Sequence, residues 1–279
     1  MTLDPRLNPF RDEIAAKHLQ GQVEAKSFVH PDTLAVAVPV TDMLGEPGAE
    51  GRTSQALYGE RFDVYEEREG WAWGQLATDG YVGWIKARHL MSLRDDTPTH
   101  LVSALLTRAT PTSIKTLGFG PLPMGSQVAV LGDQAPVAAS SAPFLQTSTG
   151  AIPEAHLKPM DQVIDDWVAV AEMYLGSPYV WGGRSSLGLD CSALVQLALQ
   201  QAGIDCLRDS DLQESGLGKT LERRDGLQRG DLVFWAGHVG IMVDSDMFVH
   251  ANAWHMAVAK EPLADAEARI GPVRMIKRL

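Results

Sequence analysis

Cys191 is the residue of this chain best placed for covalent chemistry. It is one of only two cysteines, and it stands where a loop with Gly182 and Gly183 gives way to an apolar run. The unpaired amides at a helix start favour a thiolate, but a helix dipole contributes only about 0.3–1 kcal/mol, and one pKa unit corresponds to about 1.4 kcal/mol. A thiol, whose ordinary pKa is about 8.5, therefore needs a neighbouring imidazolium to become an effective nucleophile.

Two of the eight histidines lie in segments that could supply this group. His238 begins the expected strand HVGIMV, and His250 lies in the expected strand MFVHAN. If residues 244–246 form a three-residue loop, Gly240 lies opposite His250, and His238 is diagonal to His250 on the same sheet face, about 7–8 Å away. Gly240 would then leave open space on that face for the end of a helix that carries Cys191. A two-residue loop would place the histidines on opposite faces.

Each of these side chains also has a purely structural explanation. A free cysteine is among the most frequently buried residue types, and a histidine in a strand is more often a packed or edge residue than a catalytic one. Gly182 and Gly183 alone indicate only a tight loop. We assign the second cysteine, Cys206, to packing or to the surface, because no comparable pattern surrounds it.

The segment that begins at Cys191 has the apolar periodicity of a helix. Its apolar residues form one stripe until Gly203, which is placed as a C-terminal cap, and Asp190 is placed to cap the N-terminus. The earlier segment DQVIDDWVAVAEMYLG (161–176) has the same periodicity, with Val163 at the start of its apolar face. Strands in RGDLVFW, GHVGIMV and MFVHANA follow, and this order is typical of an α+β domain.

The first half of the chain has the pattern of small β-barrels. GWAWGQLATDGYVGWI (70–85) predicts a hairpin with Asp79 and Gly80 in a two-residue turn. A weak repeat follows, because LYGERFDV (57–64) aligns with PMGSQVAV (123–130) and ARHL aligns with EAHL, at offsets of 66 and 67 residues. The repeat predicts two barrels of one kind.

These patterns divide the chain into four segments. We expect an N-terminal extension (1–30), a first barrel (31–95), a degenerate second barrel (98–158) and a C-terminal α+β domain (161–279). The second barrel lacks the tryptophans of the first. Such aromatics commonly belong to the core and rim of a small barrel, but the barrel that keeps them is also the one expected to face a ligand.

Composition and charge exclude several kinds of partner. The chain has 279 residues, 45% of them hydrophobic, and a formal net charge of −11 that is spread along the sequence. This charge argues against binding nucleic acid or holding an anionic wall polymer, and no run of eighteen apolar residues predicts a membrane span. The first 19 residues contain no apolar leader with a small-residue cleavage site, so we expect a cytoplasmic protein with a small soluble substrate.

Taken together, the motifs match a known pattern. PYVWGG…DCSALV, GDLVFWAGHVGIMV and MFVHAN, over about 161–279, resemble the NlpC-type cysteine peptidases, papain-like hydrolases of bacterial cell-wall peptides. EREGWAWGQLATDGYVGWI resembles the bacterial SH3-like domains that often precede them. In layout the chain resembles the intracellular γ-D-glutamyl-L-diamino-acid endopeptidases, the dipeptidyl-peptidase VI group. The resemblance implies an α+β, papain-like peptidase domain after two small SH3-like barrels.

The resemblance also implies roles for the residues of the motifs. Cys191 would be the nucleophile, and His238 would hold its thiolate as an ion pair, acting as general base and later as general acid. His250 would orient the His238 ring. The hydroxyl of Tyr179 would help the Cys191 amide to stabilise the oxyanion, although a tyrosine of the core explains this residue equally well.

A second group of residues is implied to bind the substrate. Asp190 and Ser192 match positions that bind the free amine of the first substrate residue, although Asp190 also fits a plain N-cap. Glu46 and Tyr81 are the corresponding candidates in the SH3-like part. One departure is visible, because Ala193 stands where the family usually has glycine, and its methyl group could narrow the cleft.

The expected activity is hydrolysis of the γ-D-glutamyl to diamino-acid bond in free peptides that begin L-Ala-γ-D-Glu, for cell-wall peptide recycling, with no cofactor. A zinc hydrolase with Cys191, His238, His250 and His255 as ligands would be a different enzyme class, although no short H-x-x-x-H or C-x-x-C pair anchors such a site. The same motifs would also fit a wall-binding module with an inactive peptidase, or an exported enzyme that remodels intact wall.

Overall fold

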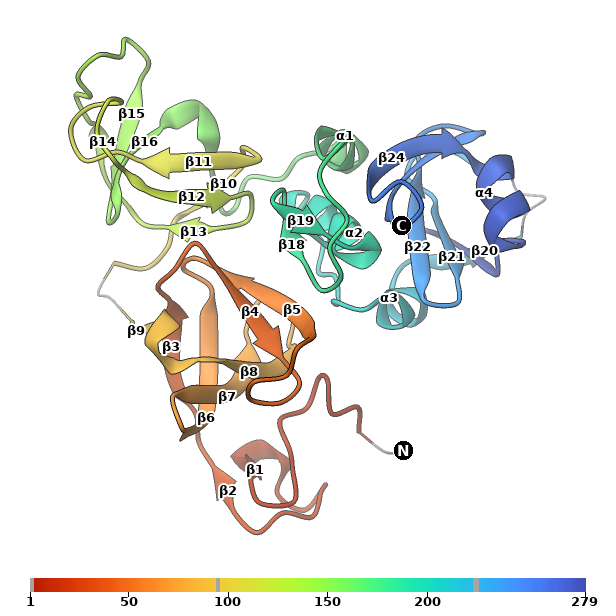
Figure 1. The fold of residues 1–279 in the computed structure, drawn as a ribbon, viewed down its shortest axis with the longest axis horizontal. Helices are drawn as coiled ribbons and strands as arrows, with labels where there is room; N and C mark the ends of the chain where they lie inside the picture. Colours follow the sequence, from red (N-terminus) through yellow and green to blue (C-terminus); the bar gives the residue numbers. More distant parts are fainter. Residues whose placement is uncertain (1–2, 94–95, 223–225) are drawn as a thin grey trace. The chain divides into compact units, whose positions relative to one another are not determined.

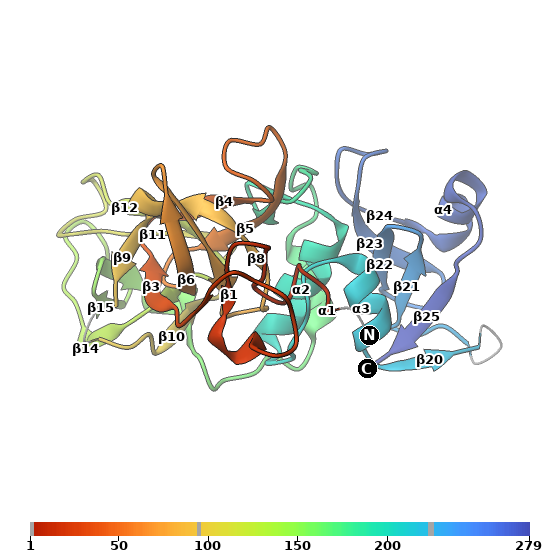
Figure 2. The same ribbon diagram turned by 90° about the horizontal axis from the view of Figure 1, so that it is seen from below.

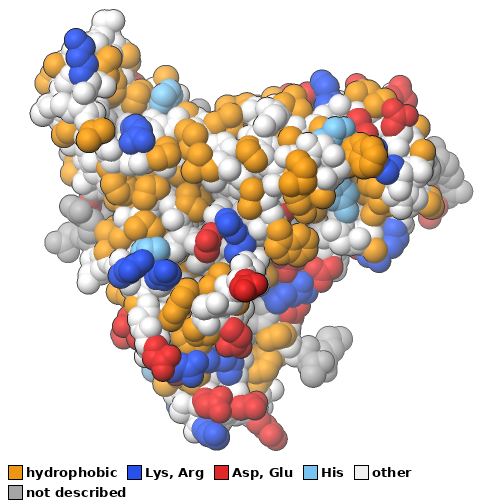
Figure 3. All heavy atoms as spheres, viewed as in Figure 1, with side chains coloured by type: hydrophobic (Ala, Val, Ile, Leu, Met, Phe, Trp, Pro, Cys, Tyr) orange, Lys and Arg blue, Asp and Glu red, His pale blue; other side chains and the backbone are white. Residues whose placement is uncertain are grey.

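The computed structural model describes residues 3–93, 96–222 and 226–279 (Figure 1). The chain forms two compact units, Met1–Met160 and Asp161–Leu279. No helix among the described residues is long and apolar enough to cross a membrane. On the face shown in Figure 3, acidic side chains are interspersed with basic ones and are not gathered in one patch.

Seven antiparallel strands of the first unit form one sheet in the order β5-β4-β8-β7-β6-β3-β9. Their alternating apolar side chains meet in a single core that includes Phe62, Leu76 and Tyr81. The strands are β3 (Asp32–Val36), β4 (Val40–Leu44), β5 (Arg52–Leu57), β6 (Arg61–Arg68), β7 (Trp71–Leu76), β8 (Val82–Lys86) and β9 (Leu90–Ser92), with a 3-10 helix, η2 (Ala87–His89), before β9.

The hairpin between β7 and β8 is present, but the predicted two-residue turn at Asp79 and Gly80 is wrong. The amide of Leu76 donates to the carbonyl of Tyr81 (2.9 Å), so the loop contains the four residues 77–80, with Gly80 at a φ of +73°. Both Leu76 and Tyr81 belong to the core. A two-residue turn would have shifted the pairing by two residues while keeping the same faces, so apolar alternation could not distinguish the two registers.

The N-terminal arm, residues 3–30, packs along this sheet. The amide of Val82 donates to the Arg6 carbonyl (2.8 Å). The guanidinium of Arg11 pairs with Glu66 and lies 4.1 Å from the ring centroid of Trp73, a cation–π arrangement. The arm contains β1 (Ala15–Ala16), the 3-10 helix η1 (Lys17–Leu19) and β2 (Phe28–Val29).

The remainder of the first unit consists of three small sheets, β12-β11, β16-β15-β14 and β13-β10-β17. Read in this order, their eight strands follow the order of the seven-stranded sheet, with β14 and β13 together in the place of β6. A threonine–histidine hydrogen bond is also repeated, between Thr41 Oγ1 and His89 Nδ1 and between Thr107 Oγ1 and His156 Nδ1, each 2.8 Å. The elements are β10 (His100–Val102), β11 (Leu106–Ala109), β12 (Phe119–Pro123), β13 (Gln127–Val128), β14 (Val130–Gln134), β15 (Phe144–Thr147), β16 (Gly150–Pro153), the 3-10 helix η3 (Glu154–His156) and β17 (Leu157–Pro159).

The second unit is built on a six-stranded antiparallel sheet in the order β20-β25-β21-β22-β23-β24. Figures 1 and 2 show α2 and α4 on opposite sides of this sheet. The elements are α1 (Trp167–Met173), β18 (Arg184–Ser185), β19 (Gly188–Leu189), α2 (Cys191–Gln201), α3 (Ser210–Gly216), β20 (Lys219–Leu221), β21 (Leu232–Trp235), β22 (His238–Met242), β23 (Met247–Asn252), β24 (Ala257–Pro262), α4 (Leu263–Ile270) and β25 (Met275–Arg278).

Helix α1 is shorter than its sequence pattern predicts. The side chain of Asp166 accepts a hydrogen bond from the Ala169 amide (3.1 Å) and caps the helix, which therefore begins at Trp167. Val163, predicted on the buried face, lies before the helix and is 55% exposed.

Candidate active site

Helix α2 begins at Cys191, which confirms the sequence prediction for this element. Asp190 Oδ1 accepts a hydrogen bond from the Ala193 amide (2.9 Å) and caps the helix, and Gly203 lies just beyond its end with a φ of +69°. Cys191 is only 7% exposed. The thiol is therefore held at the buried first position of a capped helix.

The pairing of β22 with β23 decides how the two histidines lie. Ile241 pairs with Val249, and the Val243 amide donates to the Met247 carbonyl (2.8 Å), so the loop is the predicted three residues, 244–246. This register places both histidines on one face, and His238 Nε2 lies 2.8 Å from His250 Nδ1. The prediction from loop length is confirmed.

Gly240, between the two histidines on the same face, does not leave room for α2. A Cβ at position 240 would lie 2.5 Å from Cδ2 of Phe248 and 3.3 Å from Cβ of His250. Phe248 packs in a cluster with Leu263 and Ala266 of α4. The predicted open space is therefore wrong, because the missing side chain makes room for Phe248 and His250.

Gly240→Ala should destabilise the protein and loosen the histidine pair. The new methyl group overlaps the Phe248 ring, and overpacking of a well-filled core costs about 1–3 kcal/mol. Urea unfolding of the variant should show this loss, and Phe248→Leu in the same chain should recover part of it. A stability equal to that of the unmodified protein would contradict the packing described here.

The backbone amides of Val239, in β22, and of Ser192 act on the Cys191 thiol and lower its pKa. Burial and then the charge of Asp190 raise the pKa of the Cys191 thiol to about 12, against smaller opposing effects of the two amides. Among the described residues no hydrogen bond joins the sulfur to the His238 ring, so the direct contact that the implied ion pair requires is not seen.

Burial also lowers the pKa of His238, to about 4; the charge of Arg269 lowers it further and that of Glu261 opposes this. Both shifts favour the neutral thiol and the neutral imidazole over the ion pair that the resemblance implied. The reason is desolvation, which disfavours the charged form of both buried groups.

The chain of contacts continues beyond His250 to residues that the sequence analysis missed. His250 is fully buried, and its Nε2 lies 2.8 Å from Glu261 Oε1. Arg269 of α4 donates two hydrogen bonds to the same carboxylate, at 2.6 and 3.2 Å. The only signal for Glu261 in the sequence is a charged residue inside a strand, and its proximity to His250 depends on the register between β23 and β24.

Asp190 has more partners than the N-cap alone. Its carboxylate accepts two hydrogen bonds from Arg208 (2.8 and 2.7 Å) and one from the Gly182 amide (2.9 Å). Arg208, only 1% exposed, also donates to Ser192 Oγ (2.9 Å) and to the Gly183 carbonyl (3.1 Å). Binding of a substrate amine by Asp190 and Ser192 stays a prediction, and these donors already occupy the carboxylate.

Tyr179 lies close to the nucleophile. Burial, followed by the charges of Cys191 and Asp190, raises the pKa of its hydroxyl to about 12, so the hydroxyl keeps its proton at neutral pH and can donate it in a hydrogen bond. The Cys191 amide is at the first helical position, where backbone donors have no partner within the helix. Ala193 is fully buried, so its methyl group adds no exposed surface to the site.

Glu46 and Tyr81 lie together, but in the first unit. Both line a pocket of about 230 Å³ whose wall also includes Arg6 and Arg11 of the N-terminal arm and Trp73 of β7. Their predicted contact with a substrate amine stays a prediction.

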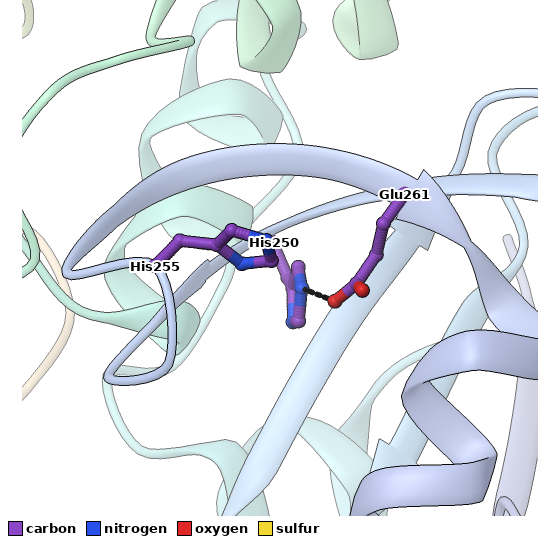
Figure 4. Close-up of side chains that lie close together, drawn as sticks. All are labelled: His250, His255 and Glu261. Atoms are coloured by element: carbon purple, nitrogen blue, oxygen red, sulfur yellow. Dashed lines mark hydrogen bonds and ion pairs between the residues drawn. The ribbon is translucent and has the colours of Figure 1, made fainter.

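Among the described residues, the side chains that could hold a metal ion are not the four that the zinc hypothesis names. Figure 4 shows His250 between His255 and Glu261, and the potential donor atoms of these three residues lie within 4.8 Å of one another. Neither Cys191 nor His238 belongs to this group. The guanidinium of Arg269 already neutralises Glu261, which opposes a second cation there, so the geometry favours thiol chemistry.

Comparison with known proteins supports this interpretation. Residues 176–266 match the NlpC/P60 family, and residues 43–90 match the bacterial dipeptidyl-peptidase Sh3 domain. Dipeptidyl-peptidase 6 of Lysinibacillus sphaericus is 39% identical over 85 residues, 30% of this chain and 31% of that protein. Gamma-D-glutamyl-L-lysine dipeptidyl-peptidase of Bacillus subtilis is 26% identical over 227 residues, 71% of each chain. The matches span about a third of the length of the first curated relatives.

A solved structure shares the fold. The crystal structure of an NlpC/P60 family protein from Bacillus cereus ATCC 10987 superimposes with a TM-score of 0.74, over 88% of this chain and 99% of that one, at 18% identity. At this identity the likeness shows the fold alone. The family matches thus identify residues 176–266 as similar to the NlpC/P60 family and residues 43–90 as similar to the bacterial dipeptidyl-peptidase Sh3 domain.

Proposed function

We propose that this protein is a cysteine peptidase that hydrolyses the γ-D-glutamyl to diamino-acid bond in free cell-wall peptides. The observation that carries the proposal is the placement of Cys191 at the start of α2, beside the first residues of β22, where His238 contacts His250. Relatives named gamma-D-glutamyl-L-lysine dipeptidyl-peptidase support the bond type.

The geometry supports the following sequence of steps. Because Nε2 of His238 contacts His250, Nδ1 is the nitrogen left to take the proton of Cys191 as the sulfur attacks the peptide carbonyl carbon. The oxyanion accepts hydrogen bonds from the Cys191 amide and the Tyr179 hydroxyl. The C–N bond breaks as His238 returns the proton to the leaving amine, and water, deprotonated by His238, then hydrolyses the thioester.

Activity should persist to unusually low pH. An ordinary imidazole is protonated below a pH of about 6.5, whereas the pKa of His238 is lowered to about 4 by burial and by Arg269. Protonation removes the base, so the acid limb of kcat/KM should have its midpoint near pH 4, with activity largely retained at pH 5.5. A pH profile of kcat/KM measures this directly, and a midpoint near 6.5 would contradict the described environment of His238.

We further propose that the substrate is a soluble peptide with a free amino terminus, processed in the cytoplasm during recycling. By resemblance, Asp190, Ser192, Glu46 and Tyr81 are the candidates for the amine; Asp190 already accepts hydrogen bonds from Arg208 and from backbone amides. The net charge of −11 is a poor match for sustained binding to an anionic wall.

The first unit is proposed to hold two SH3-like barrels, at 31–95 and 98–158. Two observations support the second barrel, which lies outside the 43–90 and 176–266 matches. Its strands follow the order of the first sheet, with β14 and β13 in the place of β6, and the Thr41–His89 hydrogen bond recurs as Thr107–His156.

The test compares L-Ala-γ-D-Glu-diaminopimelate with its N-acetyl derivative, with products identified by mass spectrometry. A hydrogen bond to a charged group is worth about 1.5–3 kcal/mol, so acetylation should lower kcat/KM at least about tenfold. EDTA should leave activity intact, and a thiol alkylator should remove it. Equal kcat/KM for the two peptides would favour an exported, wall-remodelling enzyme, and restoration by zinc after EDTA would favour the metal hydrolase.

A further inference from the structure

We propose that Glu261, held by Arg269, is a positioning residue of the peptidase: it fixes His250, and through it His238, in the one tautomer that leaves Nδ1 of His238 free to accept the Cys191 proton. The inference rests on the proposed function for its catalytic consequence. The part of the inference that concerns the tautomer of His238 can be tested without any substrate.

The contacts form one continuous line from the site into the protein. His238 Nε2 lies 2.8 Å from His250 Nδ1, and His250 Nε2 lies 2.8 Å from Glu261 Oε1. Figure 4 shows Glu261, on β24, directed at the His250 ring, with the bond between them dashed. The same oxygen accepts a hydrogen bond from Arg269 Nη2 (2.6 Å).

The charge state of Glu261 determines which atom donates and which accepts in the hydrogen bonds that link Glu261, His250 and His238. Burial acts to raise its pKa, but hydrogen bonds from Arg269 and His250 outweigh burial and lower the pKa. Glu261 is therefore ionised at neutral pH and can only accept hydrogen bonds. It follows that His250 carries its proton on Nε2, which donates to the carboxylate.

The position of that proton then determines the state of His238. Burial, the charge of His238 and that of His255 lower the pKa of His250 to about 3, against the opposing effect of Glu261, so its ring is neutral and Nδ1 is an acceptor. His238 must therefore donate from Nε2, which leaves the lone pair on Nδ1. With no acceptor at position 261, His250 could instead carry its proton on Nδ1, and His238 would then be protonated at the nitrogen needed by Cys191.

Arg269 keeps the Glu261 carboxylate ionised and in place. The charged and titratable groups that face His250 are His238 on β22, His255 on the loop before β24, Glu261 on β24 and Arg269 on α4. Arg269 also lies 5.1 Å from the ring centroid of Trp254. These contacts hold the guanidinium, and with it the carboxylate, in one position.

The experiment uses three variants of the full chain. Glu261→Ala removes the acceptor, and Glu261→Gln keeps an oxygen for both His250 and Arg269. Glu214→Ala is the matched control, because Glu214 pairs with Arg274 and its side chain is 10% exposed, the same as that of Glu261. Both alanine variants remove a buried carboxylate that pairs with a guanidinium, 23% exposed for Arg269 and 56% for Arg274, so their melting temperatures report the purely structural cost.

The expected result separates kcat from KM. Glu261→Ala should lower kcat by about 10²-fold and change KM by less than about twofold. This loss of kcat lies between the roughly tenfold loss typical of a residue that hydrogen-bonds to a site residue and the roughly 10⁴-fold loss caused by a fixed wrong tautomer. Glu261→Gln should recover most of kcat, and Glu214→Ala should keep it. A kcat for Glu261→Ala equal to that of Glu214→Ala would overturn the positioning role.

A second measurement is independent of the substrate. ¹⁵N NMR of histidine-labelled protein should show the His238 proton on Nε2 in the unmodified chain and in Glu261→Gln, and a mixture of tautomers in Glu261→Ala. An unchanged His238 tautomer in Glu261→Ala would overturn the inference even if kcat fell. If no variant cleaves the peptide, the proposed function fails, and the NMR result still decides the inference.

Discussion

Replacing Cys191 with alanine is expected to lower kcat by at least about 10⁴-fold while the protein folds normally. The thiol is the nucleophile of the proposed reaction, and no other group at the start of α2 can form the thioester. Alanine is the best helix former, and the helix keeps its cap because Asp190 bonds to the Ala193 amide. Hydrolysis assays and circular dichroism on the same preparation measure the two parts of this prediction.

The second cysteine supplies the matched control. Cys206 is also buried, at 5% exposed against 7% for Cys191, and its sulfur donates a hydrogen bond to the Leu207 carbonyl at 3.5 Å. Cys206→Ala should therefore remove a similar volume and keep activity. A comparable loss of kcat in both variants would show that the nucleophile is wrongly assigned.

The two histidines should differ in the same assay. His238→Ala should lower kcat more than His250→Ala, because His250 only orients the base.

Arg208→Met is expected to destabilise the protein by about 3–5 kcal/mol, the usual cost of breaking a buried ion pair by removing one partner. Arg208 is 1% exposed and gives two hydrogen bonds to Asp190, which is itself 7% exposed. Without Arg208 a buried carboxylate is left with backbone amides and one hydroxyl. Because the same arginine holds the Gly183 carbonyl and Ser192, the start of α2 should also lose order, and activity should fall with stability.

Urea unfolding of a double-mutant cycle tests this account. Asp190→Asn keeps a good N-cap residue and removes the charge, so the double variant with Arg208→Met should be more stable than Arg208→Met alone. Arg229→Met is the exposed counterpart, since Arg229 pairs with Asp166 with side chains 36% and 54% exposed, and such pairs are worth about 0–1 kcal/mol. Equal losses for Arg208→Met and Arg229→Met would contradict the importance of burial.

The elements that carry the nucleophile and the histidines could be predicted because their signals are local. Asp190 and Gly203 mark the two ends of α2, and the length of the 244–246 loop sets the register that brings His238 to His250. Each of these depends on residues within a few positions of one another, where backbone geometry allows few arrangements.

The residues that were missed depend on contacts across the fold. Arg208 follows α2 in an irregular segment, and Glu261 and Arg269 lie on elements that meet only after the sheet has formed. In sequence, such charged residues look like ordinary surface residues, which Asp, Glu, Lys and Arg usually are. The neutral state of the Cys191–His238 pair was missed for the same reason, because desolvation depends on everything packed around it.

The pocket that holds Glu46 and Tyr81 is made from two stretches of chain that are far apart in the sequence. Arg6 and Arg11 come from the N-terminal arm, which is fastened to the sheet by the Val82 amide and by a hydrogen bond from Gln75 Nε2 to the Leu7 carbonyl (2.9 Å). If recombination moved this part of the chain into another protein, the pocket would stay intact only if the transferred segment began near Pro5. This start lies well before residues 43–90, which match the SH3 domain. A shorter graft would carry the sheet and only one wall of this pocket.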